Sequence, residues 1–370
     1  MKKIDANSNK IKKRFSVSNL VTYKKITLKQ AGEILCLSYS RTKYLYARYK
    51  QEGLSGLEHK GKGKQSNHCI HKNVKQAILL LYKSKYADCS LSLAVELLKT
   101  NDSFVISRET LRQWLIADNI PYTHIRRRPY RRFYKRSDCF GALLQLTVYN
   151  YNWIQSAENG ARQCLLGLCD NATNIKLFHM THHSSIHSAM TILQIWIKKY
   201  GIPQGIYISD ELFVKNKHLK IVLANLGIEL QTPKGGAYFS TTNCALTTLG
   251  YRLVCEMKVQ GIATIQEANV YILEVFCVKI NKKLSRQPEI HENAHVLCDE
   301  SQSIDKFFYF FFTKKVKQNK CIIIFKKKYF LLNFTENNTN ESKFVQIKRF
   351  LDGSIKIYQN KTEINYEILE

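Results

Sequence analysis

Two stretches of the chain decide its fold. The first runs from Phe140 to Thr173, FGALLQLTVYNYNWIQSAENGARQCLLGLCDNAT, and the second from Ile206 to Phe213, IYISDELF. In the first stretch two apolar runs flank a polar connection, which predicts a β-hairpin, and the second begins with an apolar strand that ends on Asp210. This arrangement is typical of nuclease-like sheets, which present carboxylates to metal ions at strand ends.

The surroundings of these strands predict an α/β core over residues 139–290. Strands alternate there with amphipathic helices, among them 185–200, which Gly201 and Pro203 end. Beyond residue 291 short apolar runs separated by turn residues predict a small β-rich domain, residues 291–370. The predicted fold class is therefore multidomain, with the α/β core between all-α modules at the N-terminal side and a small β domain at the C-terminal side.

The first helical module, residues 1–60, has the pattern of a helix-turn-helix. Thr27 is a predicted N-cap, a short turn falls at Leu37 and Ser38, and the helix that follows turns Leu45 and Tyr49 inward. The residues expected to face outward, toward a DNA major groove, are Ser40, Arg41, Lys43, Tyr44 and Arg48. An ordinary helical hairpin with a solvated basic face is the alternative.

A second helical module is predicted at residues 73–122. Ser107 is the predicted cap of its last helix, whose apolar residues Leu111 and Leu115 face inward and whose Arg108 and Arg112 face outward. Two such modules in series predict a long, bipartite DNA site.

A basic linker, residues 123–138, joins the modules to the core. Its arginines alternate with aromatic residues, a mixture suited to follow a phosphate backbone, because each neutralised phosphate releases a counterion and rings rest on sugars or bases. A merely solvated linker is the alternative. The DNA-binding candidates here are Arg126, Arg127, Arg128, Arg131 and Arg132.

The composition agrees with a nucleic-acid partner. The 370 residues carry a formal net charge of +28, which favours polyanions. No apolar run is long enough for a membrane span and no signal peptide is visible, so we expect a cytoplasmic protein that does not bind a membrane. The cysteines form no CxxC pair; Cys36, Cys164, Cys169, Cys255 and Cys277 are expected to be buried hydrophobic residues, and a zinc site around Cys69 is not favoured.

Taken in order, several motifs resemble insertion-sequence transposases of the ISNCY group. They are TLKQA at Thr27, SRETLRQWL at Ser107, FGALLQL at Phe140, CDNAT at Cys169, YISD at Tyr207, LTTLGYRLVCEM at Leu246, GIATIQEAN at Gly261 and LDGSIKIY at Leu351. The resemblance covers nearly the whole chain. It implies a ribonuclease-H-like catalytic core of the integrase superfamily, which cuts and rejoins DNA at element ends.

The same resemblance implies a two-metal site built from two Asp and one Glu, with Mg²⁺ or Mn²⁺ as cofactor in an active protein. The second Asp corresponds to Asp210, which would be the remaining metal ligand. The first falls on Thr147 and the Glu on Asn243, or on Thr242 or Cys244 in a shifted alignment. None of these is an acid, so the sequence predicts impaired or absent catalysis.

Other roles stay open at this stage. Asp170 is a candidate substitute acid, or it caps the turn that follows it, and the histidines 179, 182, 183 and 187 are expected to face solvent. The leading hypothesis is a transposase-derived protein, inactive or impaired, that binds double-stranded DNA at terminal repeats as a homo-oligomer on a bacterial nucleoid. The alternatives are an active transposase with a rearranged acid set around Asp210, and a DNA-binding regulator.

Overall fold

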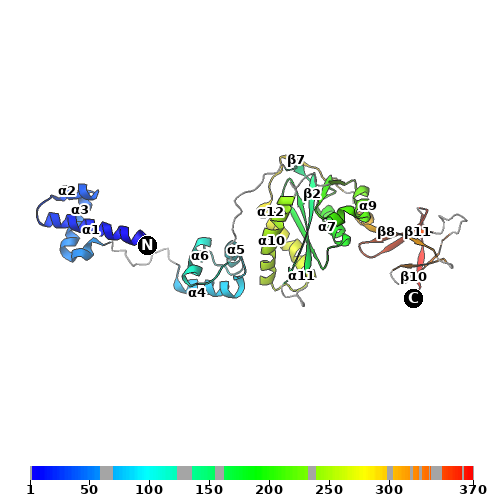
Figure 1. The fold of residues 1–370 in the computed structure, drawn as a ribbon, viewed down its shortest axis with the longest axis horizontal. Coiled ribbons are helices and arrows are strands. Elements are labelled where there is room, and N and C mark those ends of the chain that lie inside the picture. Colours follow the sequence, from blue (N-terminus) through cyan, green and yellow to red (C-terminus); the bar gives the residue numbers. More distant parts are fainter. Residues whose placement is uncertain are drawn as a thin grey trace. The chain divides into compact units, whose positions relative to one another are not determined.

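The protein divides into two compact units, Met1–Lys75 and Gln76–Glu370 (Figure 1). The computed structural model describes residues 2–58, 70–122, 136–154, 162–231, 239–297, 303–316, 320–324, 327–332, 334, 344–360 and 362–369, without the side chains of 2–8, 239–248, 328 and 369. The finer division into five parts stays a prediction.

The first unit is built from three α-helices in its described part: α1 (Lys2–Thr22), α2 (Leu28–Leu35) and α3 (Tyr39–Glu52), followed by a 3₁₀ turn. The predicted cap is confirmed, because Thr27 and Gln30 form a reciprocal capping box at the start of α2. The predicted turn at Leu37 and Ser38 is present, and in addition Ser38 caps α3 by accepting a hydrogen bond from the Arg41 backbone N–H. The sequence pattern does not predict helix α1, because its lysine-rich first half shows no clear apolar face.

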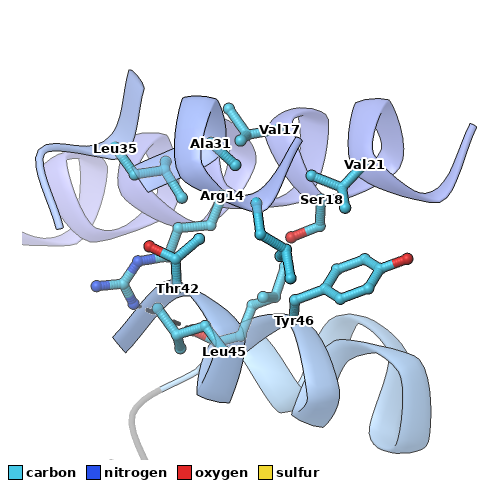
Figure 2. A pocket seen from close by; sticks show the side chains of 11 residues that line it. Arg14, Val17, Ser18, Val21, Ala31, Leu35, Thr42, Leu45 and Tyr46 are labelled. Carbon is cyan, nitrogen blue, oxygen red and sulfur yellow. Dashed lines mark hydrogen bonds between the residues drawn. The ribbon is translucent and has the colours of Figure 1, made fainter. Parts of the chain in front are cut away.

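Side chains from all three helices meet in the core of this unit, where Figure 2 shows Val17, Ala31 and Leu45 around a small space. The cavity measures about 10 Å³, room for one water at most. The packing of α2 against the turn is close: a Cβ on Gly32 would lie 2.9 Å from the Leu37 carbonyl oxygen. Glycine at this position therefore permits the close packing of α2 against the turn that follows it.

The second unit begins with a helical module. Helix α4 (Lys72–Leu81) continues as a π-helical turn (Tyr82–Tyr86) and is followed by α5 (Leu91–Asn101) and α6 (Arg108–Ala117). Ser107 caps α6 by accepting a hydrogen bond from the Thr110 backbone N–H, as predicted. Leu111 and Leu115 are fully buried, so the predicted inner face of α6 is confirmed.

The core of the second unit is a five-stranded sheet in the order β4-β3-β2-β5-β6. Strands β2 (Leu143–Tyr151), β3 (Gln163–Asp170) and β4 (Lys176–Thr181) form an antiparallel meander. Strands β5 (Gly205–Ile208) and β6 (Glu229–Gln231) continue the sheet parallel to β2. The predicted hairpin and the strand before Asp210 are both present.

Helices cover both faces of this sheet. Figure 1 shows α7 (Ile186–Tyr200) and α9 (Lys217–Asn225) on one side of β2, and α10 (Phe239–Val259) and α12 (Cys277–Leu284) on the other. Along the chain, the short α8 (Glu211–Lys215) precedes α9, and α11 (Ile265–Tyr271) and a π-helical turn (Ile272–Phe276) separate α10 from α12. The predicted helix at 185–200 is confirmed, with Ser185 as its cap.

Residues 290–296 return to the beginning of the core. Strand β7 (Ile290–Asn293) pairs in parallel with β1 (Cys139–Phe140), and Val296 forms a bridge with Ile202. Between them His295 is buried and accepts a hydrogen bond from Trp196 Nε1 at 3.1 Å. Gly141 (φ +87°) passes so close to His295 that a Cβ there would lie 2.2 Å from its Nδ1. Glycine is therefore required at this crossing.

The C-terminal part forms two small sheets around a shared apolar core. Their orders are β13-β12-β11-β8 and β14-β10-β9. The strands are β8 (Tyr309–Lys315), β9 (Cys321–Ile324), β10 (Lys327–Leu331), β11 (Phe344–Phe350), β12 (Ile355–Gln359), β13 (Thr362–Ile364) and β14 (Tyr366–Leu369). The predicted β-rich character is thus present.

Polar contacts join this β-rich part to the core helices. The Asn225 amide donates to Tyr309 Oη at 3.1 Å, and Asp305 accepts from Lys198 at 2.6 Å. Burial changes along the run FFYFFF at 307–312: Phe308 is fully buried before β8 begins, whereas residues 309–312 of β8 are half-buried. Its position at a sheet edge beside the core explains the difference.

The predicted burial of the cysteines is largely confirmed, with one exception. Cys164, Cys169, Cys255 and Cys277 are buried, whereas Cys36 is exposed because it ends α2 in a left-handed conformation. Across the part of the chain that the structure covers, no helix has the length and apolar character to cross a membrane.

Candidate active site and nucleic-acid surfaces

Thr147 occupies the centre of the sheet. It lies on β2, is 2% exposed, and its Oγ1 donates a hydrogen bond to the Gly167 carbonyl of β3 at 3.4 Å. On the other side of β2, the register with β5 pairs Leu146 with Ile208, and the Ser209 N–H donates to the Leu146 carbonyl. Asp210 follows directly, so the structure brings Asp210, just beyond the end of β5, beside the middle of the neighbouring strand β2, where Thr147 lies.

Asp210 is held by the helix that begins beside it. Its Oδ1 accepts the Leu212 backbone N–H at 2.8 Å, which makes Asp210 the N-cap of α8. The carboxylate is half-buried near Cys164 of β3. Burial raises the pKa of the Cys164 thiol to about 11, and the charge of Asp210 adds to this rise.

Asn243 lies on α10, and its side chain is outside the described residues. Helix α10 contacts β2 and β3, and it approaches the sheet so closely that a Cβ on Gly250 would lie 2.6 Å from the Trp153 ring. Trp153 also contacts Tyr149, which shares a sheet face with Thr147 because alternate residues of a strand point the same way. Thr147 therefore lies on the face that α10 covers.

Asp170 is fully buried, and its carboxyl group has three partners. Oδ1 accepts the Gly141 N–H at 3.0 Å, and Oδ2 accepts the N–H and the hydroxyl of Thr173, both at 2.7 Å. It lies three residues beyond Gly167, the partner of Thr147, which is about 10 Å along the strand. This geometry favours the turn-capping interpretation over the substitute acid.

Glu256 on α10 belongs to a buried ionic network. Its carboxylate accepts from Arg252 Nε at 2.7 Å, from Tyr271 Oη at 2.7 Å and from Lys279 Nζ at 3.3 Å. Arg252 also donates to Glu96 of α5 at 2.5 Å. The network therefore connects the second helical module to the core. Local sequence patterns do not predict this connection, because the residues of the network lie far apart in the chain.

Electrostatics confirm how strongly Glu96 is held. Burial alone would raise its pKa, but hydrogen bonds from Arg252 and Lys283 outweigh that effect and lower the pKa of Glu96 to about 2. Burial and the Glu256 hydrogen bond likewise raise the pKa of Tyr271. Both shifts show that the acids of α5 and α10 serve the junction.

The described side chains do not assemble a two-metal site. Within the described ranges no three side chains of His, Cys, Asp or Glu come together as metal ligands. Beside the middle of β2 and the end of β5, the described donor set offers a single carboxylate, Asp210, while the Thr147 hydroxyl is neutral and donates to a backbone carbonyl. Mg²⁺ prefers charged oxygen ligands, so this set lacks the negative charge that two ions need.

The histidines near α7 have separate environments. His182 and His183 are exposed, as expected. His179 differs, because it is half-buried and its pKa is lowered by burial and by the charge of His187. His187 stacks on Phe310 and approaches the Leu351 carbonyl at 3.3 Å, so it contributes to the contact with the β-rich part.

The predicted recognition surface of α3 is mostly exposed. Ser40, Arg41, Lys43 and Tyr44 all face solvent, and the Arg41 guanidinium lies 5.4 Å from the Tyr44 ring centre. Arg48, expected to face outward, is 9% exposed and donates to Glu52 and to the Glu58 carbonyl. The sequence pattern assigns Arg48 to the outer face of α3, but it does not show whether a long arginine side chain on that face reaches solvent or folds back onto its own unit.

On α6, Arg108 is exposed and Arg112 forms a two-point ion pair with Glu109, with distances of 2.9 and 2.6 Å. These hydrogen bonds raise the pKa of the Arg112 guanidinium. The linker candidates Arg126, Arg127, Arg128, Arg131 and Arg132 lie outside the described residues.

The strand order and directions of the sheet, with helices on both faces, define a ribonuclease-H-like core. No family model matches the chain. A protein of Sinorhizobium fredii, described as "Putative transposase y4bF", is 25% identical over 303 residues, which cover 78% of this chain. The resemblance to transposases is thereby confirmed, and the chain spans 65% of the length of that relative.

Solved structures of retroviral integrases are also similar. The HTLV-2 integrase catalytic core domain in complex with magnesium is 14% identical, covers 37% of this chain and 86% of its own, and gives a TM-score of 0.30. The simian T-cell lymphotropic virus intasome in complex with a PP2A regulatory subunit is 13% identical over 79% of this chain and 99% of its own, with a TM-score of 0.34.

Proposed function

We propose that this protein is a transposase-derived DNA-binding protein whose core no longer catalyses strand transfer. One observation carries the proposal: Thr147 stands in the middle of β2, at the position where the resemblance requires an Asp, and its hydroxyl is committed to the Gly167 carbonyl. The single acid beside it, Asp210, caps α8. Loss of one well-placed electrostatic group costs a catalyst about a hundredfold or more, and two such losses should abolish the reaction.

The DNA-binding part of the proposal rests on the charge and on the exposed faces of α3 and α6. The net charge of +28 exceeds what solubility requires. Arg41 and Lys43 on α3 and Arg108 on α6 are exposed at the positions expected to face a major groove. The partner proposed is double-stranded DNA with the terminal repeats of the element, bound by a homo-oligomer on the bacterial nucleoid in the cytoplasm.

The decisive experiment compares the native chain with the Thr147→Asp/Asn243→Glu variant. Both are incubated with Mg²⁺ or Mn²⁺ and with duplexes that carry the ends of the chain's own genetic element, and nicking and strand transfer are measured. We expect DNA binding by both proteins and products only from the variant.

A matched control keeps the positions but not the charge. Thr147→Val/Asn243→Gln should bind DNA and give no product. Products from the native chain, lost in Asp210→Asn, would instead establish an active transposase with a rearranged acid set.

A further inference from the structure

A buried lysine marks the end of the sheet opposite to Thr147 and Asp210. Lys176 begins β4, is 2% exposed, and its Nζ donates to the Asn174 carbonyl at 2.8 Å. Burial lowers the pKa of Lys176, and the charges of Arg136 and Arg286 lower it further. Lysine is rarely buried in this way without an acidic partner.

Two arginines join Lys176 on the same turn. Arg136 NH1 donates to the Asn171 carbonyl at 3.1 Å, and the backbone N–H of Arg286 donates to the Thr173 carbonyl at 2.9 Å. The charged groups of Arg136 and Lys176 are thus attached to neighbouring carbonyls between β3 and β4, and Arg286 is attached to the same turn through its backbone, where its charge acts on both. Lys176 is buried, Arg136 is half-buried and Arg286 is exposed, so the cluster extends from the interior to the surface.

The turn that carries the cluster is held firmly. Asp170 binds Thr173 at its start, and the Asn174 amide donates to the Leu284 carbonyl at 2.9 Å. Asn281 on α12 exchanges two hydrogen bonds of 2.8 Å with the backbone of Lys176. The cluster is therefore preorganised, which reduces the entropy that a ligand must overcome.

The positive charge of the cluster is not balanced by an ion pair. Within the part of the chain that the structure covers, neither Arg136, Lys176 nor Arg286 forms a salt bridge. The carboxyl group of Asp170 lies close by, but Gly141 and Thr173 occupy its oxygens. Like charges held together disfavour the unliganded state, and an anion between them would offset this repulsion.

The position of the cluster indicates which anion. Arg136 is the first described residue of the basic linker 123–138, whose charge pattern suits a phosphate backbone. Because β3 runs antiparallel to β2, Asp170 pairs with Leu144 near the start of β2, away from Thr147. The cluster therefore lies away from Thr147 and Asp210, and its member Arg136 belongs to the linker.

We propose that Arg136, Lys176 and Arg286 bind a phosphodiester group of the duplex DNA that the basic linker follows. This inference rests on the proposed DNA binding. Guanidinium groups suit the planar pairs of phosphate oxygens, and the lysine supplies a point charge from behind. The site would fix the register of DNA on the core without reading its sequence.

The test measures DNA affinity of the full chain across a range of salt concentrations. Arg286→Gln is compared with Lys282→Gln, which removes the same charge from an exposed position one turn earlier in the chain. Arg286→Gln should reduce the slope of log affinity against log salt by about 1 and weaken binding several-fold. Lys282→Gln should change the slope by less than half as much.

A second variant separates binding from folding. Lys176→Met removes the buried charge and keeps the apolar stem, so the unfolding temperature should stay the same or rise while the salt slope falls by about 1. Equal slopes for Arg286→Gln and Lys282→Gln would overturn the phosphate site, whereas failure of the native chain to bind DNA would overturn the proposed function itself.

Inorganic phosphate distinguishes a free anion from the DNA backbone. If phosphate raises the unfolding temperature of the native chain but not of Arg286→Gln, and both bind DNA equally, the cluster takes free phosphate and the DNA proposal is wrong. Competition between phosphate and DNA that Arg286→Gln abolishes would support it.

Discussion

The two ends of the core sheet treat their acids in different ways. At one end Asp170 is buried and accepts three hydrogen bonds. On α10, which covers one face of the sheet, the buried Glu256 binds the cations Arg252 and Lys279. Toward the other end Thr147 stands at the position where the resemblance to transposases implies an acid, and Asp210 holds the first turn of α8. The buried acids Asp170 and Glu256 therefore serve the fold, a role separate from the chemistry that the resemblance implies, because a fold and an activity impose separate requirements on a chain.

The largest effect is expected from Asp170→Ala. Three buried donors would lose their acceptor, which should lower the free energy of unfolding by about 4 kcal/mol. Urea denaturation measures this change. Glu211→Ala is the matched control, because its surface pair with Lys215 should cost under about 0.5 kcal/mol. If both variants lowered the free energy of unfolding by similar amounts, Asp170 would not hold the fold more strongly than a surface acid does.

Glu256→Gln should lower the free energy of unfolding by about 3 kcal/mol, since it leaves the charge of the half-buried Arg252 with fewer partners. The change should also loosen the second helical module, seen as faster proteolysis between residues 76 and 122. Glu274→Gln, an exposed acid of the same region, provides the control. Unchanged proteolysis would mean that apolar packing alone fixes the junction.

The junction should also respond to acid. The pKa of Glu96 in the folded chain is about 2, below its ordinary value of 4.5, so its stabilising effect is present above pH 4.5 and is lost as the pH falls toward 2. Urea denaturation of the native chain and of Glu96→Gln should therefore differ most near neutral pH and converge in this window. A constant difference would refute the ionic role.

The smallest effect is expected at Asp210. Asp210→Ala removes an N-cap and should cost about 1 kcal/mol, while Asp210→Asn keeps an accepting oxygen and should cost less. Thermal unfolding distinguishes the two. A gain in stability from Asp210→Ala would indicate that this acid is strained for chemistry, contrary to the capping role.

The sequence predicts those parts of the fold that depend on neighbouring residues. The hairpin of β2 and β3, the strand before Asp210 and the caps at Thr27 and Ser107 follow from local patterns. The link between Glu96 and Arg252 does not, because 156 residues separate the partners and neither has a distinctive context.

The candidate site divides in the same way. The positions of Thr147 and Asp210 on neighbouring strands follow from strand order, which the resemblance supplies. The inward turn of Arg48 depends on the Glu58 carbonyl, which follows the 3₁₀ turn and has no signature in sequence.

The pairing of β1 with β7 has a consequence for synthesis on the ribosome. Cys139 opens the core, yet its partner Ile290 and the buried His295 emerge only after every strand and helix between them. A nascent chain that stops short of Ile290 would leave Trp196 without its hydrogen-bond partner His295 and would leave β1 without its partner strand. We therefore expect the core to complete its folding late in translation, when such contacts between distant residues become available.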